Sequence, residues 1–177
     1  MNTKLQKQFD TLEKGRKGLF DDLKVYKDET INQKPSPEAW SIAQVIEHLI
    51  MSEELSLQYL QKKTIDTSKV PVAGLASQWR FLLTRTVFMM NIKYKAPSLI
   101  VPRPDFVSVK ELDARWTKVR NDTYTLLNNL PDGDLKKEIW KHAIAGKMNI
   151  YQMLAFFNIH FSRHRKQVYR TLAKLVL

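Results

Sequence analysis

Apolar residues along this chain recur every three to four positions, which is the spacing of one face of an α-helix. No segment alternates apolar and polar residues for long, as a half-buried strand would. The helical pattern covers five stretches, at about residues 3–27, 42–62, 75–92, 109–130 and 149–177. The sequence therefore predicts an all-α protein.

Polar residues define three of the helix starts. In a capping box, a Ser, Thr or Asn side chain accepts the backbone N–H three residues on, and a Gln or Glu there reaches back. This spacing occurs in Ser41 with Gln44, Ser108 with Glu111, and Asn149 with Gln152. These pairs predict helix starts at residues 42, 109 and 150.

The connections between the helices contain prolines, which a helix interior does not tolerate. Pro35 and Pro37 interrupt the chain after the first helix, and three further prolines predict an extended connection over 95–105. An irregular stretch is expected around residues 131–148. Gly15 and Gly18 weaken the middle of the first helix.

Four long amphipathic helices around one core make a four-helix bundle. The chain of 177 residues fits a single domain spanning 1–177. The helix at 75–92 is one additional helix in a long connection between the second helix and the helix that starts at 109. That length allows a crossover connection instead of a hairpin.

Composition excludes several classes of chemistry. With no cysteine there is no thiolate ligand, thiol nucleophile or redox motif. The first residues contain no apolar segment of the signal-peptide type, and no run of eighteen apolar residues occurs. We expect a cytoplasmic protein with no membrane partner.

The net charge is +11, which could attract nucleic acid, anionic lipid or an acidic small molecule. The basic residues are spread along the chain, and no zinc-finger or other nucleic-acid-binding pattern accompanies them. We interpret them as solvated helix faces and expect no specific nucleic-acid partner. The densest cluster comprises Arg163, Arg165, Lys166 and Arg170.

Three of the four histidines lie on predicted helices. His160 and His164 are four residues apart, so they share one face, and that face is otherwise apolar. Such a pair is a natural two-point metal chelate. His48 lies on a mostly apolar face of the second helix. Spacing alone leaves open whether these histidines bind a metal or form hydrogen bonds in the core.

Three segments resemble signatures of the DinB-like (YfiT-like) proteins. They are WSIAQVIEHL at 40–49, the His-x-x-x-Gly loop with the segment after it at 141–152, and NIHFSRHRKQV at 158–168. Their order and helix placement agree over nearly the whole chain. The resemblance implies an up-down-down-up four-helix bundle with a divalent metal, usually nickel or zinc, held by His48, His160 and His164. A homodimer is a further expectation.

Relatives of this kind transfer or isomerise small-molecule substrates using low-molecular-weight thiols such as bacillithiol or mycothiol, while many other members have no known activity. This chain departs from the signatures in two places. Ala143 follows His142 where Pro is frequent, and Met148-Asn149 replaces a Leu-Thr pair. These differences affect no expected metal ligand, but they leave the substrate open.

Other residues have weaker claims to a role. His142 could act as an acid–base group or bond to a metal ligand, but we favour a packing role for it. Glu47 points away from His48 and is interpreted as a solvated or interhelical charge. Trp40 is expected to pack at the helix entry. Ser52 could bond a ligand, and Arg163 could draw an anion to the site.

Three functions follow from these observations. The first is a thiol S-transferase in which the metal binds a thiol cofactor and lowers its pKa. The second is a metal-dependent hydrolase. The third is a non-catalytic binding or stress-response module that keeps the metal without turnover.

Overall fold

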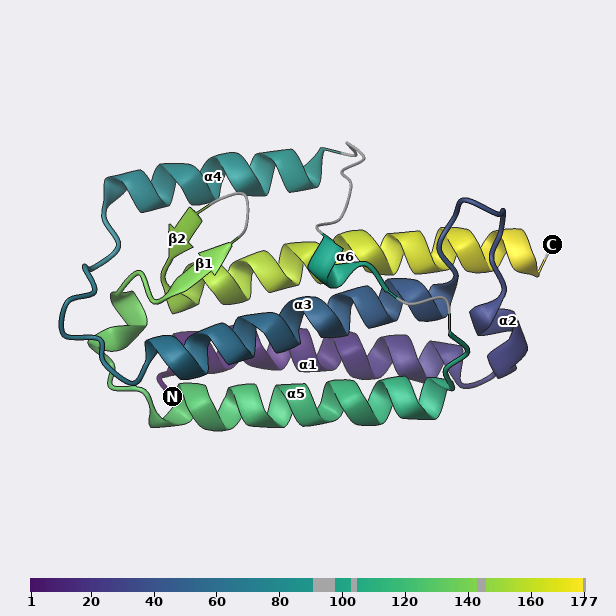
Figure 1. Cartoon of the computed structure of the whole chain (residues 1–177), viewed down its shortest axis with the longest axis horizontal. Helices are drawn as coiled ribbons and strands as arrows, with labels where there is room; N and C mark the ends of the chain where they lie inside the picture. Colours follow the sequence, from purple (N-terminus) through teal and green to yellow (C-terminus); the bar gives the residue numbers. More distant parts are fainter. Residues whose placement is uncertain (91–97, 103–104, 143–145, 177) are drawn as a thin grey trace.

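Four long helices form a bundle in the computed structural model, which describes residues 1–90, 98–102, 105–142 and 146–176. The bundle helices are α1 (Thr3–Leu23), α3 (Ile42–Lys63), α5 (Val109–Asn129) and α6 (Ile150–Leu175). Figure 1 shows α1 and α6 running in one direction and α3 and α5 in the other. The predicted up-down-down-up bundle is therefore confirmed.

The connection between the parallel helices α3 and α5 is a crossover that carries the additional helix α4 (Leu75–Met89). The predicted helix at 75–92 thus ends at Met89, and residues 91 and 92 lie outside the described residues. The prediction of an extended connection over 95–105 is wrong at Ser98–Ile100, which form the 3-10 helix η1. Much of the rest of that connection lies outside the described residues.

Four further elements were not predicted. The first helix ends at Leu23 and is followed by the short helix α2 (Asp28–Asn32). The stretch expected to be irregular contains the 3-10 helix η2 (Asp134–Lys136) and an antiparallel pair, β1 (Trp140–His142) and β2 (Gly146–Met148). Strands of three residues are too short to show alternation in a sequence. Gly146 has a φ of 79°, a backbone conformation that favours glycine.

All three predicted helix starts are confirmed. Ser41, Ser108 and Asn149 each accept the backbone N–H three residues on, and the side chain there reaches back in each case. Such a cap stabilises a helix end by about 1 kcal/mol. Because α3 and α6 each start at a defined residue, the positions of His48 and His160 along the bundle axis are defined as well.

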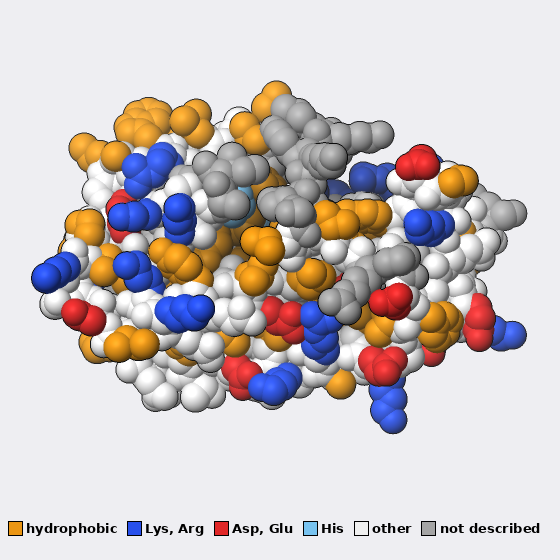
Figure 2. All heavy atoms as spheres, in the orientation of Figure 1, with side chains coloured by type: hydrophobic (Ala, Val, Ile, Leu, Met, Phe, Trp, Pro, Cys, Tyr) orange, Lys and Arg blue, Asp and Glu red, His pale blue; other side chains and the backbone are white. Residues whose placement is uncertain are grey.

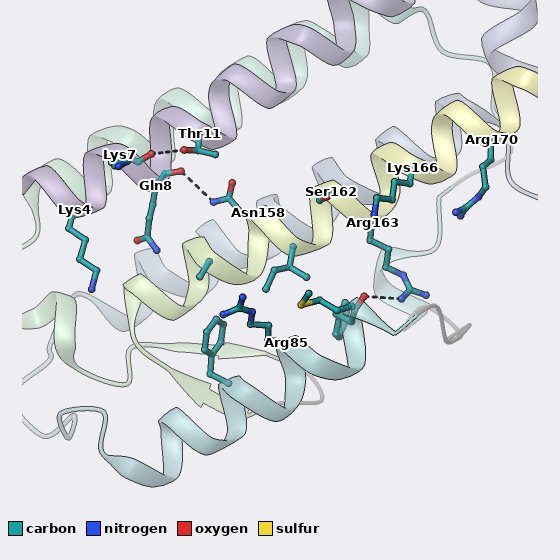
Figure 3. Close-up of a pocket in the computed structure, with 15 residues that line it drawn as sticks. Lys4, Lys7, Gln8, Thr11, Arg85, Asn158, Ser162, Arg163, Lys166 and Arg170 are labelled. Carbon is teal, nitrogen blue, oxygen red and sulfur yellow. Dashed lines mark hydrogen bonds between the residues drawn. The ribbon is translucent and has the colours of Figure 1, made fainter.

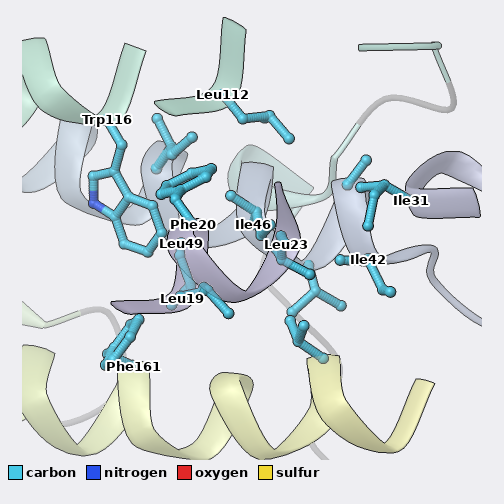
Figure 4. Close-up of a cluster of buried hydrophobic side chains, with 14 of the residues drawn as sticks. Leu19, Phe20, Leu23, Ile31, Ile42, Ile46, Leu49, Leu112, Trp116 and Phe161 are labelled. Atoms are coloured by element: carbon cyan, nitrogen blue, oxygen red, sulfur yellow. The ribbon is translucent and has the colours of Figure 1, made fainter. Parts of the chain in front are cut away.

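The bundle interior is filled by apolar side chains from all four helices. One cluster lies at the end near α2 and includes Leu23, Ile46, Leu112, Trp116 and Phe161 (Figure 4). A second cluster lies at the end near the two strands. Packing of α6 against both α1 and α3 completes this core.

A buried ion pair joins α3 to α5 inside this interior. Arg120 donates to both carboxylate oxygens of Glu53, at 2.6 and 2.7 Å, and Trp116 Nε1 donates to the same carboxylate at 3.1 Å. Glu53 and Arg120 are 5% and 2% exposed, so each charge depends on its partner for stabilisation.

The crossover helix α4 lies outside the bundle, against α6 and β2. Ser77 Oγ donates to Gln152, and the Arg80 guanidinium pairs with Glu138 at 2.9 Å. The outer face of α4 is apolar and exposed. It includes Trp79 and Leu83, and orange side chains gather there in Figure 2. Among the described residues, no helix is both long enough and apolar enough to span a membrane.

The two glycines of α1 differ in their surroundings. A Cβ on Gly15 would lie 2.6 Å from the Phe161 ring of α6, whereas a Cβ on Gly18 would meet nothing within 4 Å. We expect Gly15→Ala to lower the free energy of unfolding by about 1–3 kcal/mol through overpacking. Gly18→Ala, the matched control, should raise it by about 0.5–1 kcal/mol. Urea unfolding measures both, and equal effects would contradict this account of the contact between α1 and α6.

Candidate metal centre

Three histidines from two helices meet in the bundle. His48 comes from the second turn of α3, and His160 and His164 lie one turn apart on α6. Their ring centroids are 4.6 to 5.2 Å apart. One ring nitrogen from each lies within 4.8 Å of the other two. The structure thus brings together the three residues that the sequence singled out.

Hydrogen bonds set the orientation of two of these rings. His48 Nδ1 lies 2.8 Å from the carbonyl oxygen of Ile100, and His164 Nδ1 lies 2.9 Å from Gln167 Oε1. Both partners are oxygen acceptors, so each Nδ1 carries the proton and donates. In a neutral imidazole the other nitrogen, Nε2, then keeps its lone pair. Metal-binding histidines in proteins are usually oriented in this way, with the ring nitrogen that does not bind the metal donating to a neighbouring oxygen.

The Nε2 atoms of His48 and His160 have the spacing that a shared metal ion requires. His48 Nε2 and His160 Nε2 are 3.3 Å apart. Two nitrogens bonded to one tetrahedral zinc ion at about 2.0–2.1 Å would be about 3.4 Å apart. Because His48 Nε2 bears a lone pair, the contact needs either a proton on His160 Nε2 or a cation between the two. The His48–His160 pair therefore fits a divalent ion, and a ring nitrogen of His164 lies within 4.8 Å of both.

Burial keeps all three imidazoles neutral. It lowers the pKa of His164 to about 3, against the opposing effect of its hydrogen bond to Gln167, and holds the pKa of His160 well below its ordinary value. The positive charge of Arg163 lowers both pKa values further. Burial also lowers the pKa of His48, against the opposing effect of its hydrogen bond to Ile100. Metal ligands must be unprotonated. Desolvation thus prepares the ligands near neutral pH.

Aromatic rings surround the three histidines. Phe156 stacks on His160 at 5.4 Å between centroids, Phe88 from α4 packs edge-on against the same ring at 6.1 Å, and Trp40 lies 5.2 Å from His48. Trp40 also packs against the buried core at the start of α3, as predicted. These rings exclude water from much of the centre.

The remaining candidates lie around this centre. His142 packs against Trp140, Phe156 and Phe88, with ring centroids 4.5 to 5.9 Å apart, which supports its packing role. Glu47 pairs with Arg115 of α5, so it is an interhelical charge as predicted. Ser52 has no hydrogen bond to the three histidines in the described part of the chain.

Several residues of the site were not predicted from the sequence. Gln167 could have been found, because it lies three residues after His164 on the same helix. The carbonyl of Ile100 and the ring of Phe88 could not, because both come from the crossover connection. Arg163 donates to the carbonyls of Phe88 and Met90, which ties the end of α4 to α6.

The fold and the site together define a class: a four-helix bundle with a buried three-histidine centre. Residues 11–168 match the DinB superfamily, and the chain belongs to this family. It is similar to YuaE of Bacillus subtilis (strain 168), with 27% identity over 149 residues that cover 84% of this chain and 87% of YuaE. YfiT of Bacillus subtilis has the same fold, with a TM-score of 0.62 at 14% identity, covering 97% of this chain and 87% of YfiT.

The half-buried His142 provides a test of this electrostatic environment. Burial lowers its folded-state pKa to about 4, whereas the unfolded value is near 6.5. Between these values the unfolded chain binds the additional proton, so the free energy of unfolding is highest above pH 6.5 and falls toward pH 4. We expect His142→Phe to reduce the loss of stability between pH 7 and 4.5 by about 1–2 kcal/mol. Denaturant titrations with a chelator present measure it, and an unchanged pH dependence would contradict the environment described.

Proposed function

We propose that this protein is a metal-dependent enzyme in which His48, His160 and His164 hold a divalent cation, nickel or zinc. The observation that carries the proposal is a set of three neutral imidazoles, those of His48 and His160 buried and that of His164 half-buried, with one nitrogen of each within 4.8 Å of the others. Three protein ligands leave a further coordination position for a substrate or cofactor, as in catalytic zinc sites.

The ligand set favours an anionic partner such as a thiolate. Among the described residues, no carboxylate belongs to the cluster, so the ligands themselves carry no negative charge. When bound, a divalent cation supplies Lewis-acid chemistry and lowers the pKa of a thiol or water that it contacts. We therefore place transfer of a low-molecular-weight thiol to an electrophilic small molecule first.

The chain's own residues would orient and protect the reacting groups. The bonds from His48 to Ile100 and from His164 to Gln167 hold the two Nε2 atoms toward the centre. The rings of Phe88 and Phe156 keep water away from His160. The Arg163 guanidinium adds positive charge near His160 and His164, which would favour the approach of an anion.

Hydrolysis is the second candidate. YfiT, which shares the fold, is described as a "probable metal-dependent hydrolase". The same three imidazoles would then serve water activation in place of thiol activation. A non-catalytic module that keeps the metal is the third candidate. Cytoplasmic location, a homodimer and a small-molecule substrate stay predictions.

Metal content tests the ligand assignment. We expect about one zinc or nickel ion per chain after loading, and loss of most of that ion in His160→Ala, because a two-histidine remnant binds far more weakly. His142→Ala is the matched control, since it removes a half-buried imidazole outside the cluster and should keep the metal. Elemental analysis of tag-free protein measures both. Full occupancy in His160→Ala would show that the ligands are assigned wrongly.

Thiol titration separates the first candidate from the second. Nickel- or cobalt-loaded protein should develop a sulfur-to-metal charge-transfer absorption band when a low-molecular-weight thiol is added, because the thiolate is a good ligand for these ions. The His160→Ala variant should show no such band. If bacillithiol, mycothiol and glutathione all leave the spectrum unchanged, the transferase proposal fails and hydrolysis becomes the leading candidate.

A further inference from the structure

A hollow lies on the flank of α6 that faces α1 and α4, outside the three-histidine centre. It has a volume of about 870 Å³ and is lined by fifteen residues, none of them acidic (Figure 3). None of the three histidines lines it. Its volume falls within the roughly 300–1,000 Å³ of typical small-molecule sites. We call this hollow the basic groove.

Cationic side chains line the basic groove along its length. In Figure 3 they extend from Lys4 at one end to Arg170 at the other. Within the part of the chain that the structure describes, no ion pair is found for five of them, Lys4, Lys7, Arg85, Lys166 and Arg170. The cations of the groove are Lys4, Lys7, Arg85, Arg163, Lys166 and Arg170.

The distribution of acidic residues strengthens this positive field. The chain has 18 acidic residues, and all of them lie outside residues 67–104 and 139–177. The helices α4 and α6 therefore contain no carboxylate. Two of the three helices that form the groove contribute only positive charge, so the groove attracts anions over several ångströms.

The floor of the basic groove is apolar. It is formed by side chains of α4 and α6, namely Phe81, Phe88, Met89, Ala155 and Ile159. Gln8 at the α1 side has a buried Oε1 without a hydrogen-bond partner among the described residues. The groove thus combines an apolar surface with cations along its rim.

We propose that the basic groove binds an amphiphilic anion, meaning a chain-bearing carboxylate or phosphate monoester. The apolar chain would cover the floor at Phe81, Met89 and Ile159, and the anionic group would pair with the unpaired cations Arg85 and Lys166. An inorganic anion would leave the apolar floor exposed to water, and a neutral chain would leave the cations unused. Both features of the groove therefore select the same class of ligand.

The basic groove is separate from the metal centre, but the two share a wall. Phe88 lines the groove and also packs against His160 and Phe156. None of the three histidines lines the groove, so the proposed ligand is not expected to coordinate a metal held by them. Binding in the groove should therefore persist when the metal is removed.

Calorimetric titration of the full chain tests the proposal. Dodecyl phosphate and dodecanoate, below their micelle concentrations, should bind at one site per chain, with and without a chelator. The double variant Arg85→Glu/Lys166→Glu should weaken binding by at least about tenfold, since each cation near an anionic group contributes about 1 kcal/mol. The matched control Lys17→Glu/Lys110→Glu has the same change in charge on exposed residues of α1 and α5, and it should bind within about twofold of the wild type.

Other probes decide the alternatives. Inorganic phosphate and dodecyl maltoside should each bind at least about tenfold more weakly than dodecyl phosphate, because each offers half of the recognised chemistry. Equal affinity for inorganic phosphate would show an adventitious ion only and would overturn the proposal. Three further results would overturn the proposal. They are an equal loss of affinity in the two double variants, loss of binding when the chelator is added, and binding to anionic vesicles alone.

Discussion

The contact between α3 and α6 determines where every group of the metal centre lies. It places His48 Nε2 3.3 Å from His160 Nε2 and buries both rings. Burial alone would make such a pair costly, because polar nitrogens removed from water need partners. The outer nitrogen of His48 has a partner in the carbonyl of Ile100, and a proton or a cation satisfies the inner pair. The same desolvation that costs stability also keeps the imidazoles neutral and ready to bind an ion.

The rest of the fold supports that contact. Capping boxes fix the first residues of α3 and α6, and the Glu53–Arg120 pair ties α3 to α5 on the other side of the bundle. The crossover connection then covers the centre from outside, with Ile100 bonded to His48 and Phe88 packed on His160. The site thus depends on two contributions. The local sequence sets the helix positions, and tertiary packing places the crossover connection over the histidines.

These two contributions explain what could be predicted from the sequence. The bundle helices and their starts follow from periodicity and from pairs such as Ser41 with Gln44, which act within one turn. The His160–His164 pair follows from helical spacing, whereas its meeting with His48 rested on the family resemblance. The two short strands escaped prediction because three residues carry no readable pattern. The contacts of Ile100, Phe88 and Arg120 join segments far apart in the sequence, and spacing cannot reveal such pairs.

We propose that His48, His160 and His164 together bind one divalent ion. The most direct measurement is an anomalous-difference map from crystals of the tag-free protein soaked with zinc. We expect one strong peak about 2.0–2.1 Å from a ring nitrogen of each of the three histidines. A map with no peak at this position, or with its peak on residues elsewhere while the His48–His160 contact stays intact, would contradict it.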